Sequence, residues 1–330
     1  MPKLLEVNHV SKVFRIGSIL RGRKLVAVDD VTLSIDEDKP TILTVVGESG
    51  CGKTTLAKMI LHVYPMTEGQ ILINGNDIAD QKNYDKHAFV REVQPIFQNP
   101  YETFSARKRV DTYLFNTALK LGVAKNQDEA VEVVDRTLKS VGLSLAVVKG
   151  KYPGQFSGGE LQRCSIARAL IPSPKLIVAD EPVAAIDASM KMNIVNLFKD
   201  LKDEYQVSFL YITHDLSTAY YVSDYVATLY RGNLVEFGPA QTILDHPAHP
   251  YTDLLLSSIP KVGDKWGDDS IVTESEREEY QLTACKFAPR CPRATDECFD
   301  KMPEHETTED GRRVLCYHPI RETVKEVSIN

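Results

Sequence analysis

Two stretches near the N-terminus alternate apolar and polar residues, as strands with one buried face do. They cover residues 4–14 and 25–35, and a basic turn containing Gly22 separates them. Alternation with a period of two indicates strands, and the short connection favours an antiparallel pair. The chain is therefore predicted to begin with two antiparallel strands.

Four later runs are apolar and rich in β-branched residues without alternation. They cover residues 41–46, 93–97, 176–179 and 207–212, and helix-compatible segments separate them up to about residue 238. Continuous apolar strands are typical of a sheet covered on both faces, and strands alternating with helices favour parallel pairing. We therefore expect an α/β domain built on a parallel sheet.

The strand pattern disappears between residues 101 and 156. Residues 118–121 and 130–141 instead place apolar side chains three and four positions apart, which predicts a helical insertion. Residues 264–279 are acidic and polar, which predicts a mobile link. After this link, residues 285–316 contain four of the six cysteines.

Length and charge narrow the functional classes. A chain of 330 residues can bury one large core and still carry an appendage, and a net charge of -7 argues against a nucleic-acid partner held by bulk charge. No apolar run approaches the roughly 18 residues of a membrane span, and the N-terminus lacks a signal-peptide pattern. We expect a cytoplasmic chain, in which the cysteines are thiols or metal ligands rather than disulfides.

A glycine-rich segment after the strand at 41–46 matches the phosphate-loop pattern G-x-x-x-x-G-K-S/T. Its residues are Gly47, Glu48, Ser49, Gly50, Cys51, Gly52, Lys53 and Thr54, and a helix-compatible run starts at Thr55. The glycines let successive N–H groups face the β-phosphate, and the following helix N-terminus adds its positive end. Lys53 is expected to bridge the β- and γ-phosphates of ATP, and the Thr54 hydroxyl to bind Mg²⁺.

The apolar run at 176–179 ends in two carboxylates, Asp180 and Glu181. A strand end beside the phosphate loop is the place for one acid that binds Mg²⁺ and another that polarises the attacking water. We assign the first role to Asp180 and the second to Glu181. Together with the phosphate loop, the pair predicts nucleotide hydrolysis.

The segment Ser157-Gly158-Gly159-Glu160-Leu161-Gln162-Arg163 resembles the signature sequence of ABC ATPases. The resemblance implies that Ser157, Gly158, Gly159 and Gln162 close on the ATP held by a partner subunit. It also implies that Gln98 is the Q-loop glutamine, which contacts Mg²⁺ and water, and that His214 grips the γ-phosphate. Residues 184–187 resemble the D-loop, with Ala184 where the family usually has serine.

Phe14, at the end of the first predicted strand, is a candidate for the aromatic ring that stacks on adenine. A position in the hydrophobic core is the alternative for this side chain.

Two segments resemble the dipeptide, oligopeptide and nickel branch of ABC importers: His249-Pro250-Tyr251-Thr252, and Gln98-Asn99-Pro100-Tyr101. The branch often continues the second segment to Asn-Pro-Arg, whereas this chain has Ala106 before Arg107. The resemblance implies an ABC ATPase domain at residues 1–238, with a helical subdomain at about 101–165. A C-terminal extension of the oligopeptide-transporter type follows at residues 239–330.

The four late cysteines, Cys285, Cys291, Cys298 and Cys316, include no closely spaced pair of the kind common in zinc sites. Four thiolates can hold an iron–sulfur cluster, with zinc or free thiols as the alternatives. The block resembles the C-terminal module of the importer branch, which in some members carries a 4Fe–4S cluster. We therefore expect such a cluster as a structural staple.

The resemblance implies an ATPase subunit at the cytoplasmic face of the membrane that energises import of a peptide-like solute. Its expected partners are a second, different ATPase subunit, two transmembrane permease subunits and an extracytoplasmic solute-binding protein. Nickel or an oligosaccharide is the alternative cargo. A non-transport ABC ATPase acting on DNA or ribosomes and a small-molecule kinase are the other classes, although a kinase would need neither Ser157–Gln162 nor His214.

Overall fold

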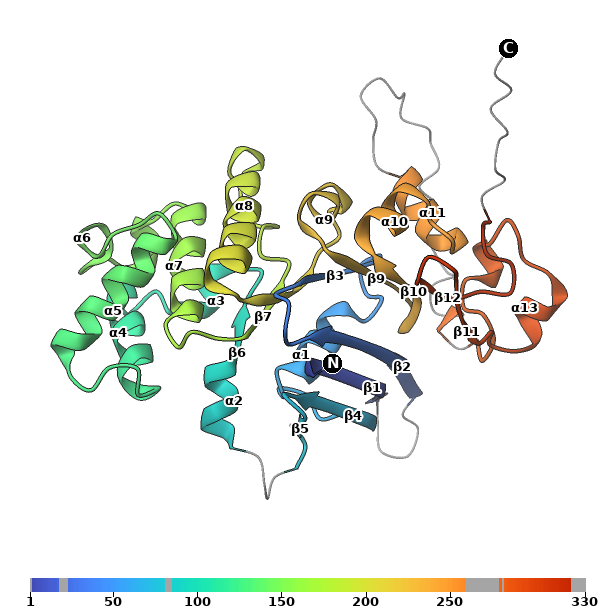
Figure 1. Cartoon of the computed structure of the whole chain (residues 1–330), viewed down its shortest axis with the longest axis horizontal. Coiled ribbons are helices and arrows are strands. Elements are labelled where there is room, and N and C mark those ends of the chain that lie inside the picture. Colours follow the sequence, from blue (N-terminus) through green and yellow to red (C-terminus); the bar gives the residue numbers. More distant parts are fainter. Residues whose placement is uncertain (1, 18–22, 81–84, 259–278, 281, 322–330) are drawn as a thin grey trace, which may run out of the picture.

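The computed structural model describes residues 2–17, 23–80, 85–258, 279–280 and 282–321 (Figure 1). Its central element is a sheet of eight strands in the order β11-β12-β10-β9-β3-β8-β7-β6. The strands β6, β7, β8, β3 and β9 run parallel, and β10, β11 and β12 extend one edge by antiparallel pairing. The bounds of these strands are β3 Ile42–Val46, β6 Val93–Ile96, β7 Leu176–Asp180, β8 Ser208–Ile212, β9 Tyr225–Tyr230, β10 Asn233–Pro239, β11 His305–Thr307 and β12 Arg313–Leu315.

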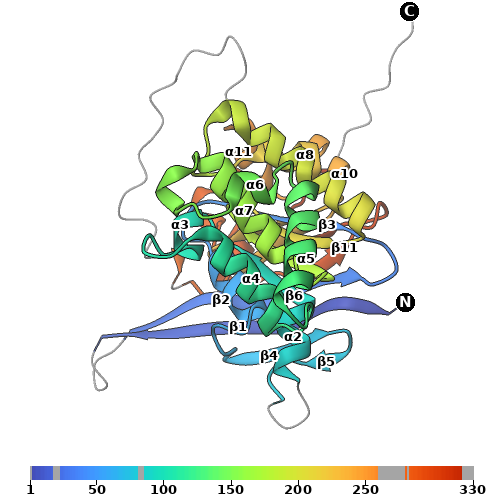
Figure 2. The same cartoon turned by 90° about the vertical axis from the view of Figure 1, so that its left-hand side faces the viewer.

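A second, antiparallel sheet has the order β2-β1-β4-β5, and its long hairpin is the one that the alternating pattern predicts. Figure 2 shows this sheet along one side of the molecule. It packs with the helix after the phosphate loop against one face of the large sheet, through a core that includes Val7, Leu56 and Val178. The bounds are β1 Lys3–Ile16, β2 Arg23–Asp36, β4 Glu68–Ile73, β5 Asn76–Asp77 and α1 Lys53–Ile60.

Helices cover the other face of the large sheet. Leu114, Leu138 and Leu161, from three different helices, are fully buried in the same core as Phe209 of β8. This group forms one end of the molecule, opposite the C-terminal residues (Figure 1), and it confirms the predicted helical insertion. The helices of this face are α3 Pro100–Thr103, α4 Val110–Lys120, α5 Gln127–Ser140, α6 Leu145–Val148, α7 Gly158–Leu170 and α8 Ala188–Tyr205. The helix α2 Lys86–Glu92 instead packs Phe89 into the core shared with the second sheet, and α9 Leu216–Val222 places Leu216 and Ala219 in a third core with Val46 of β3.

The residues after β10 fold back onto the sheet. Glu236 of β10 pairs with Val314 of β12, and its buried carboxylate accepts the N–H groups of Ala248 and His249 at 2.9 and 3.0 Å. The C-terminal residues therefore continue the large sheet. Their helices are α10 Ala240–Asp245, α11 Pro250–Ser257, the 3₁₀ turn η2 Ala288–Arg290, and α13 Asp296–Asp300.

The predicted link at residues 264–279 lies outside the described residues except at its last position. Glu279 is buried, and its carboxylate accepts from Arg231 at 2.8 Å and from the Tyr230 hydroxyl at 2.7 Å. At this residue the expectation of a mobile link is wrong, because two buried donors hold the acid. Within the described ranges, no helix is long and apolar enough to cross a membrane.

Candidate functional site

The phosphate loop joins β3 to α1, and three of its glycines have backbone angles that favour glycine. Their φ values are 150° at Gly47, 79° at Gly50 and 112° at Gly52. A Cβ atom at Gly52 would lie 2.3 Å from the carbonyl oxygen of Ala27 on β2, and one at Gly47 would lie 2.3 Å from that of Leu229 on β9. Close approach of two strands therefore fixes both ends of the loop as glycine.

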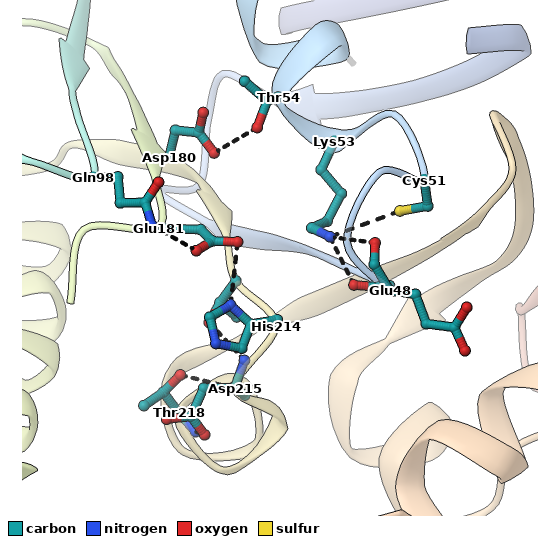
Figure 3. Close-up of polar contacts among 12 residues, drawn as sticks. Glu48, Cys51, Lys53, Thr54, Gln98, Asp180, Glu181, His214, Asp215 and Thr218 are labelled. Atoms are coloured by element: carbon teal, nitrogen blue, oxygen red, sulfur yellow. Dashed lines mark hydrogen bonds and ion pairs between the residues drawn. The ribbon is translucent and has the colours of Figure 1, made fainter. Parts of the chain in front are cut away.

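Lys53 lies inside this loop and is buried, with 5% of its surface exposed. Its ammonium donates to the carbonyl oxygens of Gly47 at 2.7 Å and Glu48 at 2.9 Å (Figure 3). The Cys51 thiol beside it is buried, which raises its pKa, so Cys51 is a neutral packing residue at ordinary pH. The loop therefore concentrates one positive charge and the N-terminus of α1 at a single point, as anion binding requires.

Thr54 and Asp180 meet beside Lys53. The Thr54 hydroxyl donates to the Asp180 carboxylate at 3.2 Å, so the predicted Mg²⁺ pair lies together (Figure 3). Burial is the main cause that raises the pKa of Asp180, and the hydrogen bond from Thr54 opposes it. A divalent cation at this carboxylate favours its ionised form, so cation binding and proton binding compete there.

Glu181 lies between Gln98 and His214, and the three residues come from three different segments of the chain. The Gln98 amide donates to Oε2 of Glu181 at 3.3 Å, and Nδ1 of His214 lies 3.1 Å from Oε1 (Figure 3). Glu181 has φ of 47°, which turns the chain sharply at the end of β7. The turn directs the carboxylate along the line from Gln98 to His214, so the structure brings the three predicted residues together.

A cap on the following helix holds the His214 segment. The Asp215 carboxylate accepts from the N–H groups of Ser217 and Thr218 at 3.1 and 3.4 Å, at the start of α9. The Asp215 N–H donates to the Thr213 hydroxyl at 2.9 Å. His214 thus projects from a turn that is fixed on both sides, although its ring is 56% exposed.

A pocket of about 260 Å³ opens between the phosphate loop and the hairpin β1–β2. Phe14 borders it, with its ring edge-on to Tyr64 at 5.6 Å between centroids. Tyr280, which precedes the C-terminal cysteines, borders it as well. The lining residues are Phe14, Leu25, Ala27, Ser49, Gly50, Gly52, Lys53, Thr54, Thr55, Glu181 and Tyr280.

The predicted signature residues begin α7, outside this pocket. The Ser157 hydroxyl and the Glu160 carboxylate form a capping box, with the Ser157 N–H donating to Glu160 at 2.9 Å. A Cβ at Gly159 would lie 3.3 Å from the end of Met190 on α8. Ser157 is exposed, whereas Gln162 is fully buried, with its amide 3.5 Å from the Phe97 carbonyl oxygen. The two side chains therefore face opposite directions, and Gln162 faces the interior of its own chain.

The four late cysteines line one narrow pocket together with Phe287 and His318. Burial raises the pKa of Cys285 and Cys291, and it raises the pKa of Cys316 to about 11. Across the described part of the chain, no three His, Cys, Asp or Glu side chains are placed to hold a metal ion. The structure thus gathers the thiols, and it does not support the expected cluster.

Sequence analysis missed Tyr280 as a border of the pocket and Arg290 as a partner of the phosphate loop. Arg290 forms a two-point ion pair with Glu48, at 2.8 and 3.0 Å. Tyr280 belongs to no recognisable motif, Arg290 lies within the late cysteine block without an assigned role, and both lie more than two hundred positions after the loop. No local pattern in the sequence carries such a contact.

Two family models match the chain. The model described as "ABC transporter" matches residues 28–184, and the model described as "Oligopeptide/dipeptide transporter, C-terminal region" matches residues 235–298. The first range covers the phosphate loop and both acidic residues, and the second covers α10, α11 and three of the four late cysteines.

Curated relatives align over nearly the whole chain. The putative oligopeptide transport ATP-binding protein YkfD of Bacillus subtilis is 37% identical over 318 residues, which cover 95% of each chain. The dipeptide transport ATP-binding protein DppF of Haemophilus influenzae is 34% identical over 319 residues, which cover 96% of each chain.

Solved structures share the fold. The structure of cbiO1 from Clostridium perfringens, part of an ABC transporter complex, has a TM-score of 0.62 at 21% identity and covers 74% of this chain and 92% of its own. The dimeric post-hydrolysis state of the ATP-binding cassette MJ0796, bound to ADP and Pi, has a TM-score of 0.62 at 24% identity. It covers 72% of this chain and 98% of its own.

Proposed function

Because this chain belongs to the ATP-binding subunits of ABC transporters, in the branch of the oligopeptide and dipeptide transporters, we propose that it hydrolyses ATP to drive peptide import. The observation that carries the proposal is the position of Glu181 between Gln98 and His214, beside the loop that holds Lys53. A base, two groups that orient it and a phosphate site are the parts that nucleotide hydrolysis requires.

Each residue has a defined part in the proposed reaction. The loop amides and Lys53 bind the β- and γ-phosphates. Thr54, Asp180 and Gln98 would hold a Mg²⁺ ion, which when bound would neutralise phosphate charge. Glu181 accepts a proton from the attacking water or orients that water, and His214 contacts the γ-phosphate. Phe14 provides the aromatic face for adenine from one wall of the pocket.

The proposed cycle needs a second subunit. Ser157 is exposed and Gly158 is half-buried at the start of α7, outside the pocket of their own chain, whereas Gly159 is buried behind them. We propose that this helix start meets the ATP on a partner. We propose a different ATPase chain as that partner, with two permease subunits and an extracytoplasmic solute-binding protein. In this assembly the chain is peripheral, at the cytoplasmic face of the membrane, and dimer closure and opening move the permease.

Within the chain, we propose an ATPase domain at residues 1–238 with a helical subdomain at about 101–165, followed by the extension at 239–330. The relatives' names favour peptides over nickel or oligosaccharides as cargo. The extent of the match to them also favours transport over a role on DNA or ribosomes.

Replacement of the proposed base tests the reaction. Glu181→Gln keeps the shape of the side chain, so ATP binding should persist while phosphate release falls by roughly 10²- to 10⁴-fold, the usual contribution of a general base. Phosphate release and equilibrium binding of a fluorescent ATP analogue provide the two measurements. Turnover within a few-fold of the unmodified protein would exclude Glu181 from this role.

Capture of the tagged chain from membranes tests the transport role. Transmembrane permease subunits and a second ATPase chain should co-purify, and ATP-dependent peptide uptake should appear in vesicles that contain the complex. Recovery of ribosomes or DNA in their place, or phosphate transfer to a small acceptor, would contradict the proposal.

We also propose that the four late cysteines hold a 4Fe–4S cluster. The proposal starts from the position of all four cysteines around one narrow pocket, since such a cluster is held by four thiolates. In the described residues the thiols are not placed to hold a metal ion, so the cluster would have to draw them closer together. Protein purified without oxygen should contain iron and acid-labile sulfide in stoichiometric amounts. Stoichiometric zinc without iron, or four titratable thiols in metal-free native protein, would contradict the cluster.

A further inference from the structure

The carboxylate of Glu48 belongs to the phosphate loop but does not face the phosphate site. It lies on the far side of the loop from the Lys53 ammonium (Figure 3). Arg290 of η2 holds it by two parallel contacts, Nη2 to Oε1 at 2.8 Å and Nη1 to Oε2 at 3.0 Å. A two-point guanidinium–carboxylate pair fixes both position and orientation, so Arg290 restrains the loop from outside.

Two tyrosines from the same C-terminal part of the chain hold the loop backbone. The buried Tyr251 of α11 accepts the Glu48 N–H at its hydroxyl oxygen, at 2.8 Å. The Tyr280 hydroxyl donates to the carbonyl oxygen of Gly50. The C-terminal residues thus contact a backbone donor, a backbone acceptor and a side chain within three consecutive positions of the loop.

Tyr280 is itself held firmly. Its neighbour Glu279 forms a buried ion pair with Arg231. The side chain of Glu279 is 1% exposed and that of Arg231 is 2% exposed. The Arg231 guanidinium also lies over the Tyr280 ring, 5.4 Å from its centroid. Tyr280 therefore presents a fixed ring to the pocket that Phe14 and Lys53 also line.

We propose that residues after 238 complete the nucleotide site, with Arg290, Tyr251 and Tyr280 as positioning residues that hold the phosphate loop in its anion-binding shape. The inference rests on the proposed function, because it assigns these residues to binding of ATP. A loop that is ordered before binding loses less conformational freedom when the phosphate enters. Affinity for ATP should accordingly depend on the extension, whereas the chemical step at Glu181 should not.

Two substitutions test whether the C-terminal residues hold the phosphate loop. Tyr280→Phe removes one hydroxyl, and Arg290→Ala removes the pair with Glu48. Each should raise the Kd for Mg-ATP and the KM by about tenfold, the change that 1.4 kcal/mol gives, and leave kcat within twofold. Tyr251 is left unchanged because it is buried in the aromatic cluster with Tyr230 and Phe287.

The matched control is Arg293→Ala. Arg293 lies in the same C-terminal part of the chain and donates to the His318 carbonyl oxygen at 3.2 Å, and among the described residues it has no hydrogen bond or ion pair with the phosphate loop. Its replacement should leave the Kd for Mg-ATP unchanged. Glu48→Gln should weaken binding as Arg290→Ala does, and the double variant should bind no more weakly than either single variant, because both remove one interaction.

The outcomes separate this inference from the proposed function. Unmodified protein that binds no ATP would refute the proposed function itself. Unmodified protein that binds ATP, with Tyr280→Phe, Glu48→Gln and Arg290→Ala all binding as tightly at unchanged Tm, would overturn the inference alone. If Arg290→Ala lowers Tm, the decision passes to Tyr280→Phe and Glu48→Gln, which keep nearly the same side-chain volume. A fall in kcat without a rise in KM would also overturn it.

Discussion

At the scale of single residues, the proposed base occupies an unusual backbone conformation. Glu181 has φ of 47°, a region that costs a residue with a Cβ atom about 1–2 kcal/mol. The backbone N–H of Glu181 donates to the Ile212 carbonyl oxygen at 2.9 Å, which ties the strained turn to the neighbouring strand β8. Strain at this residue is consistent with a carboxylate aimed at a site rather than at solvent.

Two loop glycines offer a matched pair of substitutions. Gly52→Ala would place a Cβ 2.3 Å from the Ala27 carbonyl oxygen, whereas Gly50→Ala meets nothing within 4 Å. Both positions have positive φ, so both changes incur the cost of about 1–2 kcal/mol for that conformation. We expect the free energy of unfolding to fall clearly further for Gly52→Ala, as urea titration would measure. Equal losses of unfolding free energy in the two variants would show that β2 moves away from the added Cβ without destabilising the fold.

The positions of motif residues in the site could be predicted from the sequence, because each motif is a short run of residues next to a strand or helix end. Thr54 and Asp180 lie within hydrogen-bond distance, because a loop and a strand end at the same edge of a parallel sheet lie together. Gln162 shows the limit of this reasoning: its spacing from Ser157 places it on the inner side of α7, which the motif alone does not reveal.

At the scale of elements, α11 begins with a buried histidine. Nδ1 of His249 accepts the Tyr251 N–H at 3.0 Å, and burial lowers the pKa of His249 to about 3. The neutral ring is therefore part of the folded structure, and its tautomer is fixed by the cap. Protonation would remove the acceptor and place a charge in the core.

Acid should weaken the protein through this cap. Below pH 6.5 His249 is protonated in the unfolded chain but stays neutral in the folded protein, because its pKa there is about 3. The free energy of unfolding therefore falls as the pH falls from 6.5 toward 3, by about 2 kcal/mol at pH 5. Burial raises the pKa of the adjacent Glu236, which acts in the opposite direction. Comparison with His249→Asn, which retains a capping acceptor, isolates the histidine. Urea titrations at pH 7.5 and 5 should show a larger loss for the unmodified protein than for the variant.

The strands and helices could largely be predicted, because period-two and three-to-four spacing reflect which faces are buried. The short strands β11 and β12 could not. Each has only three residues; β12 pairs with β10, which lies some eighty positions earlier, and β11 pairs with β12. Nothing in a three-residue segment distinguishes an added strand from a loop.

At the scale of the whole molecule, β12 covers the edge of β10. Val314 and Leu315 are 1% and 7% exposed, and burial of each such side chain contributes about 1.5–3 kcal/mol. A chain ending at residue 302 would lose both strands and expose the β10 edge, a template for aggregation. We expect a lower Tm and concentration-dependent light scattering, relative to a control chain ending at residue 321. Identical melting of the two would contradict the stabilising role of β12.

Contacts between residues far apart in the sequence could not be predicted from the sequence. Lys286 pairs with Asp29 of the first hairpin at 2.9 Å, and Arg290 pairs with Glu48. Such pairs depend on how whole layers dock, and one charge among many on a surface gives no sign of its partner. The expectation of a mobile link failed at its last residue, Glu279, for the same reason.

The pairing of Glu48 with Arg290 has a consequence for synthesis on the ribosome. The two residues are 242 positions apart. At a synthesis rate of 5–20 residues per second, Arg290 is therefore added about 12–50 s after Glu48. During that interval the nascent ATPase core would hold nucleotide weakly. A fragment released early would thus bind ATP weakly, and tight nucleotide binding would begin only once the C-terminal residues have been made.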